Sequence, residues 1–425
     1  MKVSKRTIIL CGILLAVAVI VIWSLALAAK AKKLTELRKF YVGRGFPASY
    51  ATALAELKYE HPRWVFQPQQ VIDLPWDAIV ERECSPGWNL VVYSKWAPNE
   101  WGRFGTTNYT PYYAANAKAY DSGAWYQASR DAIAYFMDPR NFLNEADVFM
   151  FESIGVGKVS LCNGRDARCP SSATDKMSVA PVENTLAGTF MAHAKYDGGK
   201  RSFAELLLDV GRRHGVNPVF LAGRLASEQG AGSVQANGTI GDYLVSLYTN
   251  KSDKVGEAVV WGKNYTRTGA RTKEVIKKGA AAYNGYYNFF NIGAYGSGVF
   301  EIKYNAYREA VSKEVREKYC GPWNTQARAI EGGAIRIREK YIDTHRHTRY
   351  LQKFSVLAEA GEFRWKQYMQ NIAAPLVEAR NTKRAYEEAD ALDAPHRFLI
   401  PVYTKMPSKP SRDPADGKSV YSPTR

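Results

Sequence analysis

The pattern of apolar and polar positions begins with one long apolar segment. Residues 8–29 are uncharged over a length that suits a membrane-spanning helix. Three basic residues precede this run, as is typical of a cytoplasmic N-terminus. Residues 30–44 form a basic, helix-like segment, which favours a retained anchor over a cleaved signal peptide. We therefore expect a cytoplasmic tip and single transmembrane helix in residues 1–29, followed by a juxtamembrane spacer in residues 30–44.

The region from residue 45 to residue 160 has a mixed pattern. Residues 89–93 are β-branched and aromatic and predict a strand, whereas residues 126–137 predict a helix. Asp138-Pro139 should end that helix, and a capping turn is a better interpretation of this pair than a saccharide contact. We expect an α+β N-terminal lobe here. Residues 161–195 are rich in turn-forming residues and predict a connection.

Helical periodicity dominates the remainder of the chain, so the predicted fold class is α+β, mainly α. Residues 203–214 have an amphipathic pattern that ends at a glycine, and helices are also expected at 304–318, at 327–342 and from residue 363. These elements predict a second domain over residues 196–407. The basic stretch 251–278 is either a flap or a solvated loop, and residues 408–425 predict a disordered tail.

One short helix carries a candidate catalytic carboxylate. Asn217 is a good N-cap, Pro218 suits the first helical position, and Gly230 can end the helix in a left-handed conformation. Glu228 follows Leu225 at helical spacing, which suggests a carboxyl beside apolar side chains. A carboxyl in such surroundings is costly to ionise and can act as a proton donor near neutral pH. The alternative is an ordinary solvated residue at the last turn of the helix.

A second segment, residues 286–294, combines an aromatic pair with two amides and a glycine. Aromatic faces and interleaved amides suit sugar rings, which offer apolar C–H faces and a rim of hydroxyl groups. The candidate substrate-binding residues in this segment are Tyr286, Asn288, Phe290 and Asn291.

Together with the segment Arg-Leu-Ala-Ser-Glu-Gln-Gly at 224–230, these motifs resemble the endo-β-N-acetylglucosaminidases of glycoside hydrolase family 73. Further segments of the resemblance occur in the expected order between about residue 45 and residue 407, among them 135–145, 322–325, 367–372 and 398–407. The resemblance implies a lysozyme-like catalytic domain that cuts peptidoglycan between N-acetylglucosamine and N-acetylmuramic acid. It implies that Glu228 is the general acid and that Tyr287 helps to position the sugar or the water.

The second catalytic group is not fixed by a motif. Asp242 is a candidate for a base or for a group that stabilises positive charge, although a Gly-Asp pair is also typical of a turn. Retention by a nucleophile, inversion by a base and assistance from the acetamido group of the substrate all remain open.

Charge and cysteine content restrict the partners. The chain has 58 Lys and Arg against 41 Asp and Glu, a formal charge of +17, which suits anionic wall polymers or lipid headgroups. No nucleic-acid motif is present, and we expect no cofactor and no metal. Cys162 and Cys169 bracket a short loop and are candidates for a disulfide; Cys84 with Cys320 follows only by elimination.

The leading hypothesis is therefore a peptidoglycan hydrolase held at the cytoplasmic membrane by one helix, with its catalytic domain on the extracytoplasmic side, where the glycan strands lie. Two alternatives remain. A lytic transglycosylase also uses one Glu in a lysozyme-like fold, and a non-catalytic wall-binding scaffold would use the basic surface and the aromatic segment alone.

Overall fold

The structure is a computed structural model. It describes the backbone of residues 5–92, 110–120, 124–155, 159–160, 166–167, 177–249, 271–272, 274–275, 277–296, 298–359, 362–363 and 367–416. The candidate disulfide of Cys162 and Cys169 and most of the predicted flap over 251–278 lie outside these residues.

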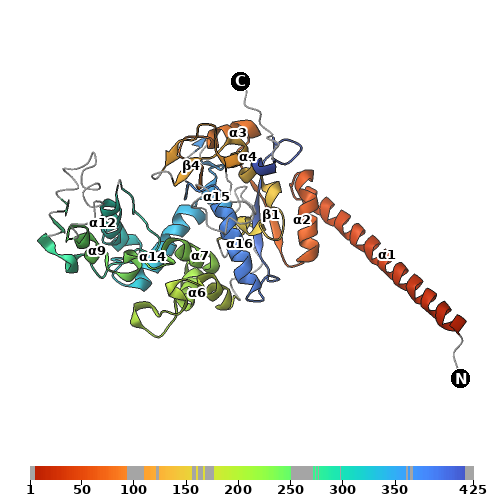
Figure 1. The fold of residues 1–425 in the computed structure, drawn as a ribbon, viewed down its shortest axis with the longest axis horizontal. Coiled ribbons are helices and arrows are strands. Elements are labelled where there is room, and N and C mark those ends of the chain that lie inside the picture. Colours follow the sequence, from red (N-terminus) through yellow and green to blue (C-terminus); the bar gives the residue numbers. More distant parts are fainter. Residues whose placement is uncertain are drawn as a thin grey trace.

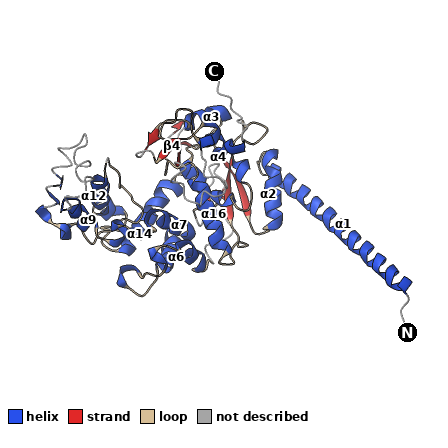
Figure 2. Ribbon diagram, viewed as in Figure 1, coloured by secondary structure: helices blue, strands red, loops and turns tan. Residues whose placement is uncertain are grey.

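The described chain is mainly helical with a small amount of strand (Figure 2). The helices are α1 (Lys5–Gly43), α2 (Ala48–Glu60), α3 (Trp76–Glu83), α4 (Arg130–Met137), α5 (Ala180–Leu186), α6 (Phe203–His214), α7 (Pro218–Gln229), α8 (Val234–Asn237), α9 (Ile240–Thr249), α12 (Val299–Ala310), α13 (Lys313–Lys318), α14 (Gln326–Ile337), α15 (Arg349–Lys353) and α16 (Ala374–Glu387). The strands are β1 (Val65–Gln70), β2 (Leu90–Val92), β3 (Ala119–Tyr120), β4 (Trp125–Gln127), β5 (Val159–Ser160), β6 (Asp166–Ala167), β7 (Ala358–Glu359), β8 (Glu362–Phe363) and β9 (Arg397–Val402).

Helix α1 is the most extended element, and it leaves the body of the molecule as a single rod (Figure 1). The predicted helical spacer over 30–44 is its C-terminal part, so the helix is confirmed there. Among the residues whose side chains are described, no helix has both the length and the apolar character needed to cross a membrane. Of the predicted span, positions 8–13 and 15 lie outside that set.

Segments far apart in the sequence meet beside the root of α1. Strand β1 pairs in parallel with β9, so that Val65 lies opposite Arg397 and Gln70 opposite Val402. A second sheet has the order β2-β4-β3, with antiparallel pairs. Helices α9 and α12 lie at the opposite end of the body, and α7 and α16 lie between (Figure 1).

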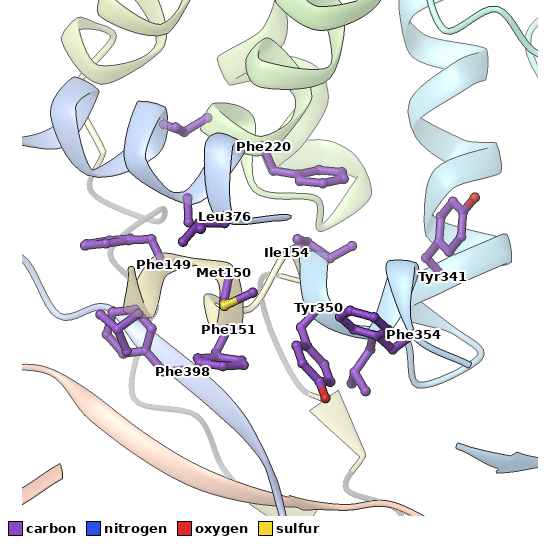
Figure 3. Close-up of a cluster of buried hydrophobic side chains, with 14 of the residues drawn as sticks. Phe149, Met150, Phe151, Ile154, Phe220, Tyr341, Tyr350, Phe354, Leu376 and Phe398 are labelled. Atoms are coloured by element: carbon purple, nitrogen blue, oxygen red, sulfur yellow. The ribbon is translucent and has the colours of Figure 1, made fainter. Parts of the chain in front are cut away.

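One hydrophobic cluster extends through both predicted domains. Figure 3 shows part of it, where Phe149 and Phe151 from the 45–160 region approach Tyr350, Leu376 and Phe398 from the 196–407 region. All five side chains are almost fully buried. The described part of the N-terminal region therefore shares one hydrophobic core with the helical region. Burial of apolar surface stabilises the contact between the two regions.

Several local predictions are confirmed and others are wrong. Strand β2 and helix α6 lie where the pattern placed them, and α6 ends at Gly215 with φ 65°. The helix expected over 126–137 starts only at Arg130, because Trp125–Gln127 pair as β4 with the neighbouring strands. Residues 367–369 are not helical, against expectation.

The predicted tail is ordered for part of its length. Arg140 donates hydrogen bonds to the carbonyls of Pro407 at 2.8 Å and Lys409 at 3.0 Å, and Asp138 accepts one from the Ser411 amide at 2.9 Å. Asp138 also caps the turn at Pro139, as the sequence favoured. The expected disorder over 408–425 is thus wrong for residues 408–416, since this turn binds them, and residues 417–425 lie outside the described part.

The pairing of Cys84 with Cys320 is wrong. Both are free thiols, and they lie in different surroundings. Cys84 follows α3, and burial raises the pKa of its thiol to about 11. Cys320 follows α13 near Glu331 and Arg213.

Candidate active site

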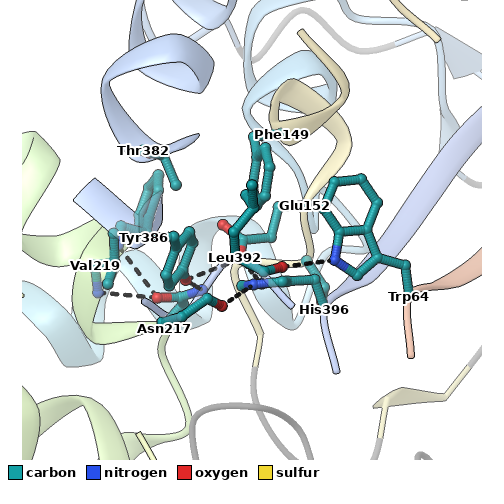
Figure 4. Close-up of polar contacts among 12 residues, drawn as sticks. Trp64, Phe149, Glu152, Asn217, Val219, Thr382, Tyr386, Leu392 and His396 are labelled. Atoms are coloured by element: carbon teal, nitrogen blue, oxygen red, sulfur yellow. Dashed lines mark hydrogen bonds and ion pairs between the residues drawn. The ribbon is translucent and has the colours of Figure 1, made fainter. Parts of the chain in front are cut away.

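Helix α7 is fixed at its N-terminus by a buried polar network (Figure 4). The Asn217 side-chain oxygen accepts hydrogen bonds from the amides of Val219 at 2.9 Å and Phe220 at 3.3 Å, which confirms the predicted cap. Asn217 also donates to the Tyr386 hydroxyl at 3.4 Å, and that hydroxyl donates to Glu152 at 2.9 Å. The start of the helix is thereby held against α16 and the N-terminal region.

Glu228 lies in the last turn of α7 and is half-buried. Its Oε2 accepts a 2.6 Å hydrogen bond from Asn291 Nδ2, and its Oε1 accepts a 3.0 Å hydrogen bond from the Tyr368 hydroxyl. Leu225 is fully buried in the core instead of sharing this environment. The carboxyl is therefore positioned by two neutral donors, and not by the unpartnered apolar setting that its spacing suggested.

A groove of about 1100 Å³ opens in front of Glu228. Its lining includes five aromatic side chains from four parts of the chain: Trp125, Phe290, Tyr295, Tyr341 and Tyr368. Amides of Asn291 and Asn371 also line it. This composition suits a glycan, since aromatic faces stack on sugar rings and amides bind hydroxyl groups.

Tyr368 is held in place from behind. Its ring lies 3.9 Å from the Arg224 guanidinium, which is itself buried and bonded to Glu378 and Gln352, each at 2.6 Å. Burial raises the pKa of the Tyr368 hydroxyl well above its usual value, and the Glu228 charge adds to the shift. Tyr368 therefore stays protonated and remains a hydrogen-bond donor to Glu228.

The orientation of the Asn291 amide is fixed by its neighbours. Its Oδ1 accepts hydrogen bonds from Gln229 and Gln235, each at 3.1 Å, which directs Nδ2 toward Glu228. Gln235 is in turn oriented by Lys303, which donates to its Oε1 at 2.6 Å. Asn291 has φ 49°, a left-handed conformation that asparagine tolerates better than most residues.

Two further carboxylates line the groove, and both are ion-paired. Glu309 pairs with Arg336. Glu378 pairs with Arg224 at 2.6 Å and with Arg349 at 3.5 Å. Among the described residues that line the groove, Glu228 is thus the one carboxylate without a cationic partner.

The structure brings only part of the predicted site together. Phe290 and Asn291 line the groove with Glu228. Asn288 is fully buried, and its side chain bonds the backbone of Ile292 at 2.7 and 3.0 Å and of Ala306 at 3.2 Å. Contrary to the prediction of a substrate contact, Asn288 therefore shapes the loop that carries Asn291.

The other three candidates lie outside the groove lining. Tyr287 packs its ring over Gly238, where an added Cβ would lie 2.9 Å from it. Tyr286 contacts Tyr307 edge-on, with ring centroids 5.3 Å apart. Asp242 is exposed in the first turn of α9, and nothing in this position supports a catalytic role.

Sequence reasoning missed Tyr368 and Arg224. Tyr368 lies within a segment that carries the family resemblance, but its aromatic character alone suggested a core helix. The adjacent pair Gly332-Gly333, in α14, is a clearer sequence signal, because glycines inside a helix indicate close packing there. A Cβ at Gly333 would lie 2.1 Å from the Phe290 ring, so the absence of a side chain there lets α14 approach the groove.

Comparison with known proteins gives matches only among solved structures. No family model and no curated protein matches the chain. A catalytic mutant of S. aureus Autolysin E in complex with the disaccharide NAG-NAM has 16% sequence identity and a TM-score of 0.41, covering 78% of this chain and 98% of its own. S. aureus glucosaminidase B has 16% identity and a TM-score of 0.40, covering 80% of this chain and 94% of its own.

A Major Bifunctional Autolysin is similar at 15% identity and a TM-score of 0.39, covering 80% of this chain and 99% of its own. The chain is therefore similar to structures of the kind of enzyme that its motifs resemble. At this identity and TM-score the similarity carries no argument about its chemistry, which has to come from the groove itself.

Proposed function

We propose that this protein is a peptidoglycan hydrolase that cleaves the β-1,4 bond between N-acetylglucosamine and N-acetylmuramic acid, with Glu228 as the general acid. The observation that carries the proposal is the position of the Glu228 carboxyl. It lies in a groove whose lining includes aromatic and amide side chains, it is held by Asn291 and Tyr368, and among the described residues it has no ion-pair partner.

The proposed step is a proton transfer coupled to bond cleavage. The protonated Glu228 gives its proton to the glycosidic oxygen while the bond from that oxygen to the anomeric carbon breaks. The leaving sugar departs with a hydroxyl group, and positive charge develops on the ring that stays behind. The Glu228 carboxylate formed in this step accepts the hydrogen bonds of Asn291 and Tyr368, which stabilises it. Water then adds to the anomeric carbon and gives its proton to Glu228, which restores the acid and completes hydrolysis.

The ion pairs of Glu309 and Glu378 make these two carboxylates poor candidates for the second catalytic group. A carboxylate that already neutralises an arginine is a poor base, and protonation of Glu378 would also remove the carboxylate partner of the buried Arg224. Of the three courses open from the sequence, we therefore favour assistance by the acetamido oxygen of the substrate. Tyr287 lies outside the groove lining, on the segment that also carries Asn291, and we keep for it the positioning role that the family resemblance implies.

Glu228→Gln tests the proposal directly. The amide cannot donate the proton in this step, so we expect loss of muralytic activity by about 10²–10⁴-fold with unchanged thermal stability. Asp242→Asn is the matched control and should retain activity, and Tyr287→Phe measures the contribution of that hydroxyl. Full activity of Glu228→Gln in a zymogram with purified sacculi would exclude Glu228 as the acid.

Analysis of the products separates the alternative functions. Mass spectrometry of digested glycan should show reducing N-acetylglucosamine ends. 1,6-Anhydro-muramic ends would identify a lytic transglycosylase, and binding to sacculi without released fragments would identify a scaffold.

We also propose that residues 8–29 anchor the enzyme in the cytoplasmic membrane, with the groove on the outer side. The uncharged apolar run and the basic helix after it support this proposal. The full-length protein should sediment with membranes and resist extraction by high salt, while a variant lacking residues 1–29 should be soluble. Release of the full-length protein by salt alone would contradict an integral anchor.

A further inference from the structure

A second hollow of about 510 Å³ lies beside the groove. It is bordered by α5, α7 and α16, which contribute among others Asn184, Ser227 and Asn381. Ser227 and Glu378 line both the hollow and the groove, so the two spaces share a border beside the last turn of α7, which carries Glu228. A branch of a ligand bound at Glu228 would enter the hollow across this border.

The two spaces differ in chemistry. Five aromatic side chains line the groove, whereas the described lining of the hollow has none and is made of amides, hydroxyls, small residues and charged groups. Stacking on sugar rings is therefore a property of the groove. The hollow offers hydrogen-bond partners without an apolar face, which suits a peptide backbone and its polar ends.

The charges of the hollow support this distinction. Glu378 is neutralised by Arg224 and Arg349, which leaves Arg384 and Glu388 as the exposed charges on its border. Within the described part of the chain, Arg384 has no carboxylate partner; its Nη2 donates to Asn381 Oδ1 at 3.0 Å. The hollow thus presents one cation and one anion, complementary to a ligand that carries both a carboxylate and an ammonium group.

We propose that this hollow binds the short peptide that peptidoglycan carries on its muramic acid, with Arg384 and Asn381 receiving a peptide carboxylate. This inference rests on the proposed function, because the glycan must lie in the groove for its peptide branch to reach the hollow. It makes the enzyme selective for glycan strands that still bear peptides over strands from which an amidase has removed them.

Binding measurements on the inactive Glu228→Gln variant test the inference without requiring catalysis. Isothermal titration calorimetry would compare glycan fragments of one length, with and without their peptides. We expect the peptide-bearing fragment to bind about tenfold more tightly, as a charge-assisted contact and its neighbours would give. Adding Arg384→Ala should remove most of that advantage, and Asn381→Ala part of it.

Lys383→Ala provides the control. Lys383 is the neighbour of Arg384 on α16 but pairs with Glu145 and Glu387 and does not line the hollow, so its loss should keep the preference. Equal affinities for the two fragments, or a preference that survives Arg384→Ala, would overturn the inference. Cleavage by the wild-type enzyme is measured separately: peptide-dependent binding without cleavage would overturn the proposed function and leave the hollow as a peptide site.

Discussion

A carboxylate lies at each end of helix α7, and the two have different partners: Glu152, from the N-terminal region, lies near its start, and Glu228 lies in its last turn. At the start of the helix, Glu152 is nearly fully buried and accepts hydrogen bonds from Tyr386 and Arg349, with His396 at 3.2 Å. At the end of the helix, Glu228 is half-buried and bonded only to neutral donors. Glu152 is thus enclosed and paired with the cation of Arg349, whereas Glu228 faces the groove, where a ligand can reach its carboxyl.

The same type of side chain therefore has a structural role at Glu152 and a proposed chemical role at Glu228. The fixed end determines where the helix starts and in which direction it runs. The buried residues of α7 hold the helix in place as far as Leu225. Glu228 lies in the next turn, at the open end, so its position follows from that of the buried part. The following predictions test this comparison.

The largest expected effect on stability comes from Glu152→Ala. Removing this carboxylate leaves the buried guanidiniums of Arg349 and Arg224 to share the single carboxylate of Glu378, and it removes the acceptor of the Tyr386 hydroxyl. We expect a loss of about 3–5 kcal/mol in the free energy of unfolding. Urea denaturation measures it. Glu81→Ala removes an exposed partner of Arg130 and should cost only about 0–1 kcal/mol. Equal losses in the two variants would mean that the network does not fix the helix.

An acidic pH should weaken the region behind the fixed end, where the His347 carbonyl accepts a 2.7 Å hydrogen bond from the Ile154 amide and the Ile154 carbonyl accepts one of 2.8 Å from the Asn217 amide. The pKa of His347 is lowered to about 3 by burial, with smaller contributions from His345 and Arg397, against 6.5 for an unperturbed histidine. Its unfolded form takes up a proton as the pH falls below 6.5 while its folded form does not, so stability present above pH 6.5 is lost progressively down to about pH 3. Between pH 7 and pH 5 this amounts to about 2 kcal/mol.

His347→Gln isolates that contribution, because glutamine does not titrate. Urea denaturation of both proteins at pH 7 and pH 5 should show a smaller loss in the variant. The same loss in both would assign the pH dependence to other groups.

The open end is tested by Tyr368→Phe. This change removes one donor to Glu228 but keeps the ring on Arg224, so we expect a roughly tenfold lower kcat with little change in thermal stability. Tyr283→Phe is the control, since the buried Tyr283 hydroxyl has no hydrogen-bond partner in the described structure and lies outside the groove lining. Unchanged kcat in Tyr368→Phe would show that Asn291 alone positions the acid.

Sequence reasoning succeeded where the signal is local. The cap at Asn217, the helix that follows it and the position of Glu228 near its end all depend on residues within one or two turns. The helix ends at Gly230 as predicted, but the left-handed conformation expected there is wrong: Gly230 is right-handed, and the left-handed residue is Gly232. The Gly230 amide donates to the Ala226 carbonyl at 3.0 Å, so the helical hydrogen-bond pattern continues as far as Gly230.

The partners of Glu228 could not be predicted in the same way. Asn291 was chosen for its residue type, but its bond to Glu228 depends on a loop held by the buried Asn288. Tyr368 lies 140 positions from Glu228 in sequence, and no local pattern relates them. The position of Asp242 shows the reverse case, where a plausible residue type points to open solvent at the start of another helix.

The parallel pairing of β1 with β9 has a consequence for the order of assembly. Val65 can meet Arg397 only after nearly the whole polypeptide has left the ribosome, while residues near the N-terminus are made within the first moments of synthesis. Such distant partners slow folding. During synthesis the edge of β1 therefore waits unpaired until β9 has been made.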